Sequence, residues 1–180
     1  MVLSYKDAVK KYGSQYKLSQ AIAEGNVYKL EEGAYSERPY ESELSIIMNK
    51  YPKAVLTGES AFYYHDLTDV IPEKYELATP SKASRISDAR IKQRYVREDI
   101  FSFGITTKES EGIQLRIYDK ERMLIELLRN KSSMPYDLYK EILFNYRRII
   151  TDLELWRIQE YAAVFPKSRM ITRLLDSEVL

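Results

Sequence analysis

Two short helices and a β-hairpin are predicted by the pattern of apolar and polar positions between residues 4 and 36. The first helix is expected to begin after Ser4, with Asp7 placed to complete a capping box, and to end at Gly13. Ser14 is expected to cap the second helix. Gly33 supplies the positive φ of a short hairpin loop between residues 27 and 35.

The second helix has an apolar face and a polar face, and this division suggests what the segment does. Its apolar side chains lie three and four positions apart: Leu18, Ala21 and Ile22. The order of elements is that of a winged helix-turn-helix, whose polar helix enters the major groove of double-stranded DNA. The residues predicted to contact DNA are Ser14, Gln15, Tyr16, Lys17, Ser19, Gln20 and Lys29. The alternative is an αα-hairpin and a β-hairpin that serve only as scaffold.

The remaining chain alternates short strands and helices and then becomes helical. Strands are predicted at 54–57, 75–79, 93–97 and 112–118, with a weaker one at 101–106. Helices are predicted at 41–51 and 58–67, after the cap Asp119, after Pro135, at 151–164, and from the cap Ser168 to Leu175. A winged helix usually has one more helix before the first one seen here, and the 41–51 helix is expected to pack in its place.

These elements predict an α+β protein of two domains. Residues 1–52 form the winged helix-turn-helix, and residues 53–180 form a mixed α/β domain that ends in a helical bundle. Pro52 marks the boundary, because it ends the preceding helix.

Composition narrows the class of protein. The chain has no cysteine, which excludes disulfides and thiolate metal sites. No apolar run approaches the ~18 residues of a membrane span, and the first residues lack the apolar core of a signal peptide. We therefore expect a cytoplasmic protein with no membrane partner. The formal net charge is only +1, so any surface that attracts a polyanion must be local.

Positive charge is concentrated in one segment, residues 81–97. It carries six basic side chains against Asp88 alone: Lys82, Arg85, Arg90, Lys92, Arg94 and Arg97. One interpretation is a patch that binds an anionic partner or takes part in countering a toxin. The other is a solvated strand edge and loop.

Catalytic signatures are absent from the sequence. His65 is the only histidine, and a single histidine after an aromatic helix is usually structural. No nucleophile-elbow, phosphate-loop or Asp/Glu-x-Lys nuclease motif occurs. We therefore expect a protein that is not an enzyme and that has no catalytic residue, no metal and no cofactor.

Three phrases, in this order, resemble the AbiEi family of antitoxins from bacterial type IV toxin-antitoxin and abortive-infection systems. They lie at residues 23–35, 51–69 and 117–128, so the likeness extends over nearly the whole chain. The second phrase ends in His-Asp-Leu-Thr where the family has His-Gly-Leu-Thr, so that Asp66 replaces glycine. In the third, Met123 replaces a threonine and Glu126 an aspartate.

The resemblance implies an antitoxin that binds inverted repeats in its own promoter as a repressor. It also implies that the C-terminal domain counters a nucleotidyltransferase toxin, or acts on that toxin's substrate. Three other functions stay open from the sequence: a stand-alone winged-helix transcriptional regulator, a protein-interaction module without DNA binding, and a nuclease-related enzyme.

Overall fold

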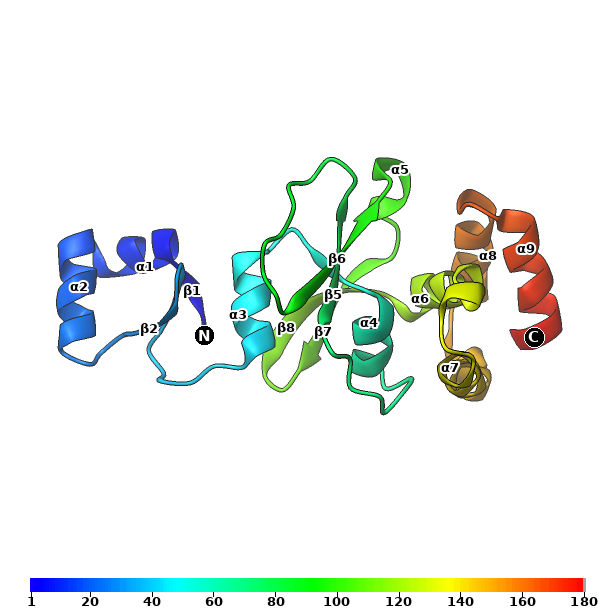
Figure 1. Cartoon of the computed structure of the whole chain (residues 1–180), viewed down its shortest axis with the longest axis horizontal. Helices are drawn as coiled ribbons and strands as arrows, with labels where there is room; N and C mark the ends of the chain where they lie inside the picture. Colours follow the sequence, from blue (N-terminus) through cyan, green and yellow to red (C-terminus); the bar gives the residue numbers. More distant parts are fainter. Residues whose placement is uncertain (180) are drawn as a thin grey trace. The chain divides into compact units, whose positions relative to one another are not determined.

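The computed structural model describes residues 1–179 and shows an α+β protein, as predicted (Figure 1). The chain divides into two compact units, Met1–Lys53 and a second that begins at Ala54. Each unit has its own sheet, one of three strands and one of five.

The N-terminal unit consists of two helices, a small sheet and a third helix. Its elements are β1 (Leu3–Ser4), α1 (Tyr5–Tyr12), α2 (Gln15–Ala23), β2 (Tyr28–Glu31), β3 (Ala34–Ser36) and α3 (Glu43–Lys50). The sheet has the order β1-β3-β2, with antiparallel pairing throughout. Strand β1 was not predicted, because two residues are too short for an alternating pattern to be visible.

The helix ends follow the predicted caps. The Ser4 hydroxyl accepts a hydrogen bond from the backbone N–H of Asp7 (3.2 Å). Gly13 ends α1 with a φ of +90°, and the Ser14 hydroxyl then accepts from the N–H of Lys17 (3.2 Å). Gly33 has a φ of +80° in the hairpin loop.

The three-stranded sheet packs on both faces, because neighbouring residues of β3 point to opposite sides. Tyr35 belongs to the cluster that buries Ala8 of α1 and Leu18 of α2. Ala34 belongs to a second cluster, with Ile46 of α3. Helix α3 therefore covers the other face of the sheet from α1 and α2, so the expectation that it replaces a missing first helix beside them is wrong.

The second unit is built on a mixed five-stranded sheet of order β6-β5-β4-β8-β7. The strands are β4 (Val55–Leu56), β5 (Tyr75–Pro80), β6 (Ile91–Val96), β7 (Ile105–Ser110) and β8 (Ile113–Tyr118). Its helices are α4 (Gly58–Tyr64), α5 (Glu98–Phe101), α6 (Lys120–Arg129), α7 (Tyr136–Ile149), α8 (Leu155–Val164) and α9 (Ser168–Leu174). Short 3-10 turns at Lys131–Ser133 and Ile150–Asp152 and a π-helical turn at Leu175–Val179 complete it.

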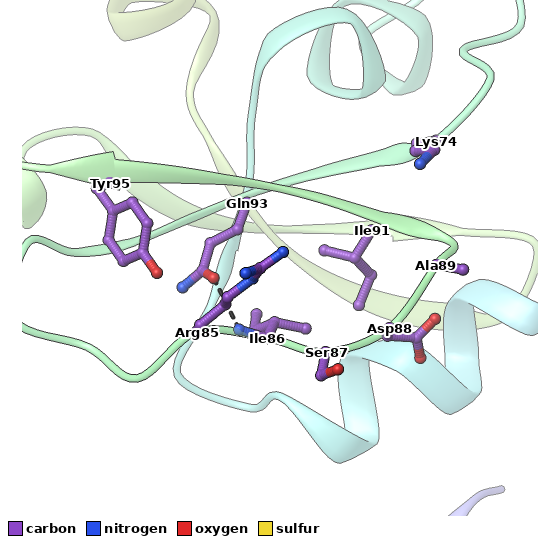
Figure 2. A pocket seen from close by; sticks show the side chains of 9 residues that line it. All are labelled: Lys74, Arg85, Ile86, Ser87, Asp88, Ala89, Ile91, Gln93 and Tyr95. Atoms are coloured by element: carbon purple, nitrogen blue, oxygen red, sulfur yellow. Dashed lines mark hydrogen bonds between the residues drawn. The ribbon is translucent and has the colours of Figure 1, made fainter.

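Strands β5 and β6 are parallel, yet only residues 81–90 connect them. A parallel return usually takes a helix, whereas this one has to travel back along a six-residue strand, about 20 Å. The loop therefore runs extended beside β6, which is the edge strand of the sheet (Figure 2).

The region predicted as a weak strand at 101–106 is different in the structure. Helix α5 reaches Phe101, and β7 begins only at Ile105. Between them Gly104 has a φ of +74°, and a Cβ there would lie 2.6 Å from the Cβ of Arg122. The chain turns at this point because glycine allows both the conformation and the close approach.

The C-terminal helices agree with the apolar spacing, with two corrections: α8 begins at Leu155 instead of Thr151, and the cap of α9 is a different residue. Asp119 caps α6 as predicted, accepting from the N–H of Arg122 (2.7 Å). Ser168 is the first residue of α9 rather than its cap, which is Lys167 with a φ of +69°.

Arg122 is the largest fully buried side chain of the unit and joins several elements. Its guanidinium lies between the rings of Tyr118 (4.3 Å) and Phe165 (4.0 Å). It donates to the carboxylate of Glu126 (2.8 Å) and to the carbonyl of Ile100 (2.7 Å). A buried charge is tolerated here because its donors have partners and both of its faces meet aromatic rings.

His65 is a buried structural histidine. Its Nε2 lies 2.7 Å from the carbonyl oxygen of Tyr118, so this nitrogen carries the proton and donates. Burial lowers the pKa of His65 to about 4, although the bond to Tyr118 acts the other way. The positive charges of Lys108 and Lys120 lower the pKa further, so the imidazole is neutral near pH 7.

Replacing Arg122 by methionine is expected to lower the free energy of unfolding by about 3–5 kcal/mol, because it breaks the buried ion pair with Glu126 and leaves the buried carbonyl of Ile100 without this donor. Urea denaturation followed by circular dichroism measures this. Arg116→Met, at an exposed position on β8, is the control and should change the value by less than about 0.5 kcal/mol. Equal stabilities of the two variants would contradict the role given to Arg122.

The protein should lose stability as the pH falls from about 6.5 to 4. In this range the unfolded chain binds a proton at His65 and the folded chain does not, so protonation favours unfolding. The difference between a pKa of 6.5 and one of about 4 corresponds to roughly 3 kcal/mol. His65→Gln, which cannot titrate but keeps an N–H donor, should flatten the pH dependence of the unfolding midpoint; an unchanged slope would show that other groups cause it.

Candidate nucleic-acid interface

Helix α2 presents a continuous polar surface to solvent. Its side chains Gln15, Tyr16, Lys17, Ser19 and Gln20 are all exposed. The opposite side of the helix is fixed to the core through Leu18 and Ala21, which are 2% and 8% exposed. The polar face is therefore held in place by burial of the apolar one.

Three of the residues predicted to contact DNA already have bonds within the N-terminal unit. Ser14 uses its hydroxyl as the cap of α2, so it positions the helix. The amide of Gln20 donates to Glu24 (3.0 Å). Lys29 on the hairpin pairs with Glu32 (2.6 Å), a glutamate whose side chain is 90% exposed. Such exposed pairs contribute little free energy, so a phosphate can replace Glu32 at small cost.

Most of the basic segment 81–97 is neutralised by neighbouring acids. Arg90 pairs with Asp88 (2.6 Å) and Arg97 with Asp99 (2.5 Å). Lys92 and Arg94 both bind Glu76, at 3.0 and 2.8 Å. Among residues 1–179, ion pairs are found for neither Lys82 nor Arg85. The positive charge left for an anionic partner is thus smaller than the count along the sequence suggested.

Glu76 of β5 is the acidic partner of both cations on β6. Its side chain is 3% exposed, whereas those of Lys92 and Arg94 are 48% and 52% exposed. A Cβ at Gly58 would lie 2.2 Å from a carboxylate oxygen of Glu76, so this glycine leaves the space that the carboxylate fills. The two cations stabilise a buried negative charge, and this is their structural role.

A hollow of about 620 Å³ lies between the loop 81–90 and one face of β6, the face opposite to Lys92 and Arg94 (Figure 2). Its lining residues are Lys74, Arg85, Ile86, Ser87, Asp88, Ala89, Ile91, Gln93 and Tyr95. Figure 2 shows Ile91, Gln93 and Tyr95 in succession along the strand, with the side chain of Arg85 reaching toward this row from the loop.

Gln93 holds the loop against the strand. Its carbonyl oxygen accepts from the N–H of Ile86 (2.8 Å), and its amide donates to the carbonyl of Ser84 (3.1 Å) and the hydroxyl of Thr79 (2.8 Å). Because the loop is hydrogen-bonded to the strand, the hollow is already formed without a ligand.

A second hollow, of about 410 Å³, has charges of both signs. It is lined by three acidic and three basic side chains, among other residues: Glu59, Glu76, Glu126, Lys92, Arg94 and Arg129. This balance gives it no preference for an anion.

The prediction from the sequence named only basic residues of the segment 81–97 as a binding patch, and it did not include Tyr95, Gln93 and Lys74, which line the hollow. The alternation of β6 separates Lys92 and Arg94, which face Glu76, from the residues that line the hollow. A two-residue period applied to residues 91–96 would have grouped Tyr95 with Gln93.

In the part of the chain that the structure describes, no cluster of histidine or acidic side chains is arranged to hold a metal ion. Within the same residues, every helix is too short or too polar to cross a membrane.

Comparison with known proteins identifies a fold and no family. No family model matches the chain, and no curated protein matches it. Among solved structures, the crystal structure of the Rv2827c protein from Mycobacterium tuberculosis has a TM-score of 0.67, over 99% of this chain and 72% of that one. The two sequences are 14% identical, so the likeness concerns the fold alone.

Proposed function

We propose that the protein binds double-stranded DNA through a winged helix-turn-helix formed by its N-terminal unit, and that it acts as a repressor of its own promoter. The observation that carries this proposal is the exposed face of α2, where Gln15, Lys17 and Gln20 project from a helix fixed by its buried side. Amide side chains bind base edges and lysines bind phosphates, so this face suits the major groove.

The hairpin β2–β3 supports the same proposal as the wing. It follows α2 directly, its loop contains Gly33, and Lys29 is exposed on it. Contacts from a helix and from a hairpin would fix the orientation of the unit on the duplex.

The second part of the proposal is that the protein is the antitoxin of a type IV system and counters a nucleotidyltransferase toxin through the unit that begins at Ala54. Support comes from the resemblance of residues 51–69 and 117–128 to the AbiEi antitoxins. This unit has a core of its own around Arg122, so the activity can be separated from DNA binding.

A protein-interaction module without DNA binding is the other function that an observation favours. The C-terminal helices expose several large apolar side chains: Tyr136, Phe144, Leu155, Trp156 and Val164. Aromatic residues are enriched in protein interfaces. Such a module would have no affinity for its promoter, so the first experiment below separates the two functions.

Replacing Lys17 and Gln20 together by alanine is expected to weaken specific binding to an inverted repeat upstream of the gene by about 2–5 kcal/mol. A gel shift with the promoter fragment, at fixed salt, measures the change. The matched control is Lys140→Ala with Gln159→Ala, two exposed residues of the same types on α7 and α8. If the α2 variant binds as tightly as the control, α2 is not the helix that reads DNA.

Residues 53–180 alone are expected to restore growth to cells that express the nucleotidyltransferase toxin that this proposal invokes, and to leave the promoter unrepressed. The N-terminal unit carries the DNA-binding face, and the second unit has its own sheet and core. Growth and a promoter reporter are measured side by side, with the full-length Lys17→Ala, Gln20→Ala variant as the control. A truncated protein that is folded by circular dichroism and gives no rescue would contradict this division of function.

A further inference from the structure

The hollow between β6 and the loop 81–90 combines an exposed aromatic ring with unpaired positive charge. Tyr95 lines the hollow and is 53% exposed. Arg85, also exposed, has no acidic partner among residues 1–179. Lys74 lines the same hollow, and its ammonium group has no ion pair in the described chain.

The acidic side chain of the lining does not cancel these charges. Asp88 binds Arg90 through both carboxylate oxygens, at 2.9 Å to Nε and 2.6 Å to the terminal nitrogen. Arg90 itself is not among the lining residues. Because this pair is internally balanced, the charges of Arg85 and Lys74 remain, and the hollow favours an anion.

The aromatic and apolar part of the lining narrows the class of anion. A bare phosphate would leave the ring of Tyr95 and the side chains of Ile86 and Ile91 without contacts. An apolar ligand would leave Arg85 and Lys74 uncompensated. A nucleotide has both a flat base, which stacks on an aromatic ring, and a phosphate, which a guanidinium binds through paired donors.

The base must be unpaired. In a duplex the faces of the bases are covered by their neighbours, so no face is available for Tyr95. The loop 81–90 is already held in place by its hydrogen bonds to Gln93, so binding a ligand does not have to pay the entropy cost of ordering this loop.

We propose that this hollow binds a nucleotide with an unpaired base, which stacks on Tyr95 while its phosphate contacts Arg85. The nucleotide is either a free mononucleotide or one unit of a single-stranded nucleic acid. The site lies in the second unit and is independent of duplex binding by α2.

The test uses the full-length protein and a fluorescein-labelled single-stranded RNA of about eight uridines. Fluorescence anisotropy gives the dissociation constant, first alone, then with uridine 5′-monophosphate as competitor, and then with the RNA annealed to its complement. Competition by the mononucleotide near its own dissociation constant identifies a mononucleotide site, and binding of the RNA without such competition identifies a single-strand site. Annealing should abolish binding at this hollow in both cases.

The variants locate the contact. Tyr95→Ala should raise the dissociation constant roughly tenfold or more, whereas Tyr95→Phe, which keeps the ring, should leave it nearly unchanged. Arg85→Ala should weaken binding and flatten its salt dependence. The matched controls are Tyr136→Ala and Arg169→Ala, at exposed positions on α7 and α9, and Lys17→Ala with Gln20→Ala on α2.

Photo-crosslinking gives a second readout that does not depend on affinity. With 5-iodouridine in the RNA, irradiation should attach the base to Tyr95, as peptide mass spectrometry would show. The proposal is overturned if neither RNA nor mononucleotide binds, if the Tyr95→Ala and Arg85→Ala variants bind as the controls do, or if the crosslink lies outside residues 74–95. Loss of duplex binding in the α2 variant alone bears on the N-terminal unit and leaves this site standing.

Discussion

The second unit depends on one buried guanidinium. Arg122 receives aromatic rings on both faces, from the end of β8 and from the residue after α8, and its donors reach the turn before β7 as well as Glu126 one helical turn away. Asp119, whose pKa is raised by burial, lies at the start of the same helix and accepts from the hydroxyl of Tyr161 (3.0 Å). Sheet and helical bundle are thus joined by polar bonds in a dry environment, where each bond is strong and each missing partner is costly.

The two surfaces proposed to bind nucleic acid are separate from the residues that hold each unit together. Neither the face of α2 nor the hollow beside β6 supplies the core of its unit, since the N-terminal helices are held by Ala8, Leu18 and Tyr35 and the sheet by Glu76 and its apolar strands. Side chains at both surfaces are therefore free to serve recognition. The Arg122 cluster also gives the third of the AbiEi-like phrases a structural meaning, because Asp119 and Arg122 in it are core residues.

Features that depend on residues close together in the chain could be predicted from the sequence, and features that depend on distant residues could not. Caps such as Ser4, Ser14 and Asp119 act within three residues, and they were predictable. Strand β1 and helix α5 were not, since Leu3 becomes a strand only by pairing with Tyr35, and Gly104 turns the chain against a side chain from α6. Charge counting found the cations of 81–97, but their partner Glu76 is on another strand. Asp66 is a further case: it has a φ of +62°, a conformation that glycine adopts without strain, and its exposed carboxylate pairs with Lys108 of β7 (3.0 Å), a contact that the sequence does not reveal.

The short return between β5 and β6 has a consequence for association. An uncovered edge strand offers a row of backbone donors and acceptors to any extended segment, including one from another copy of the chain. The loop 81–90 is tied to the side chain of Gln93, which projects from one face of β6, so the loop covers that face and leaves the backbone edge of the strand open. The opposite edge, β7, carries Lys108 and Glu109 and ends in the tight turn at Gly112. Both edges of this sheet therefore carry charged side chains, Lys92 and Arg94 on β6 and Lys108 and Glu109 on β7, and these charges oppose uncontrolled addition of a further strand.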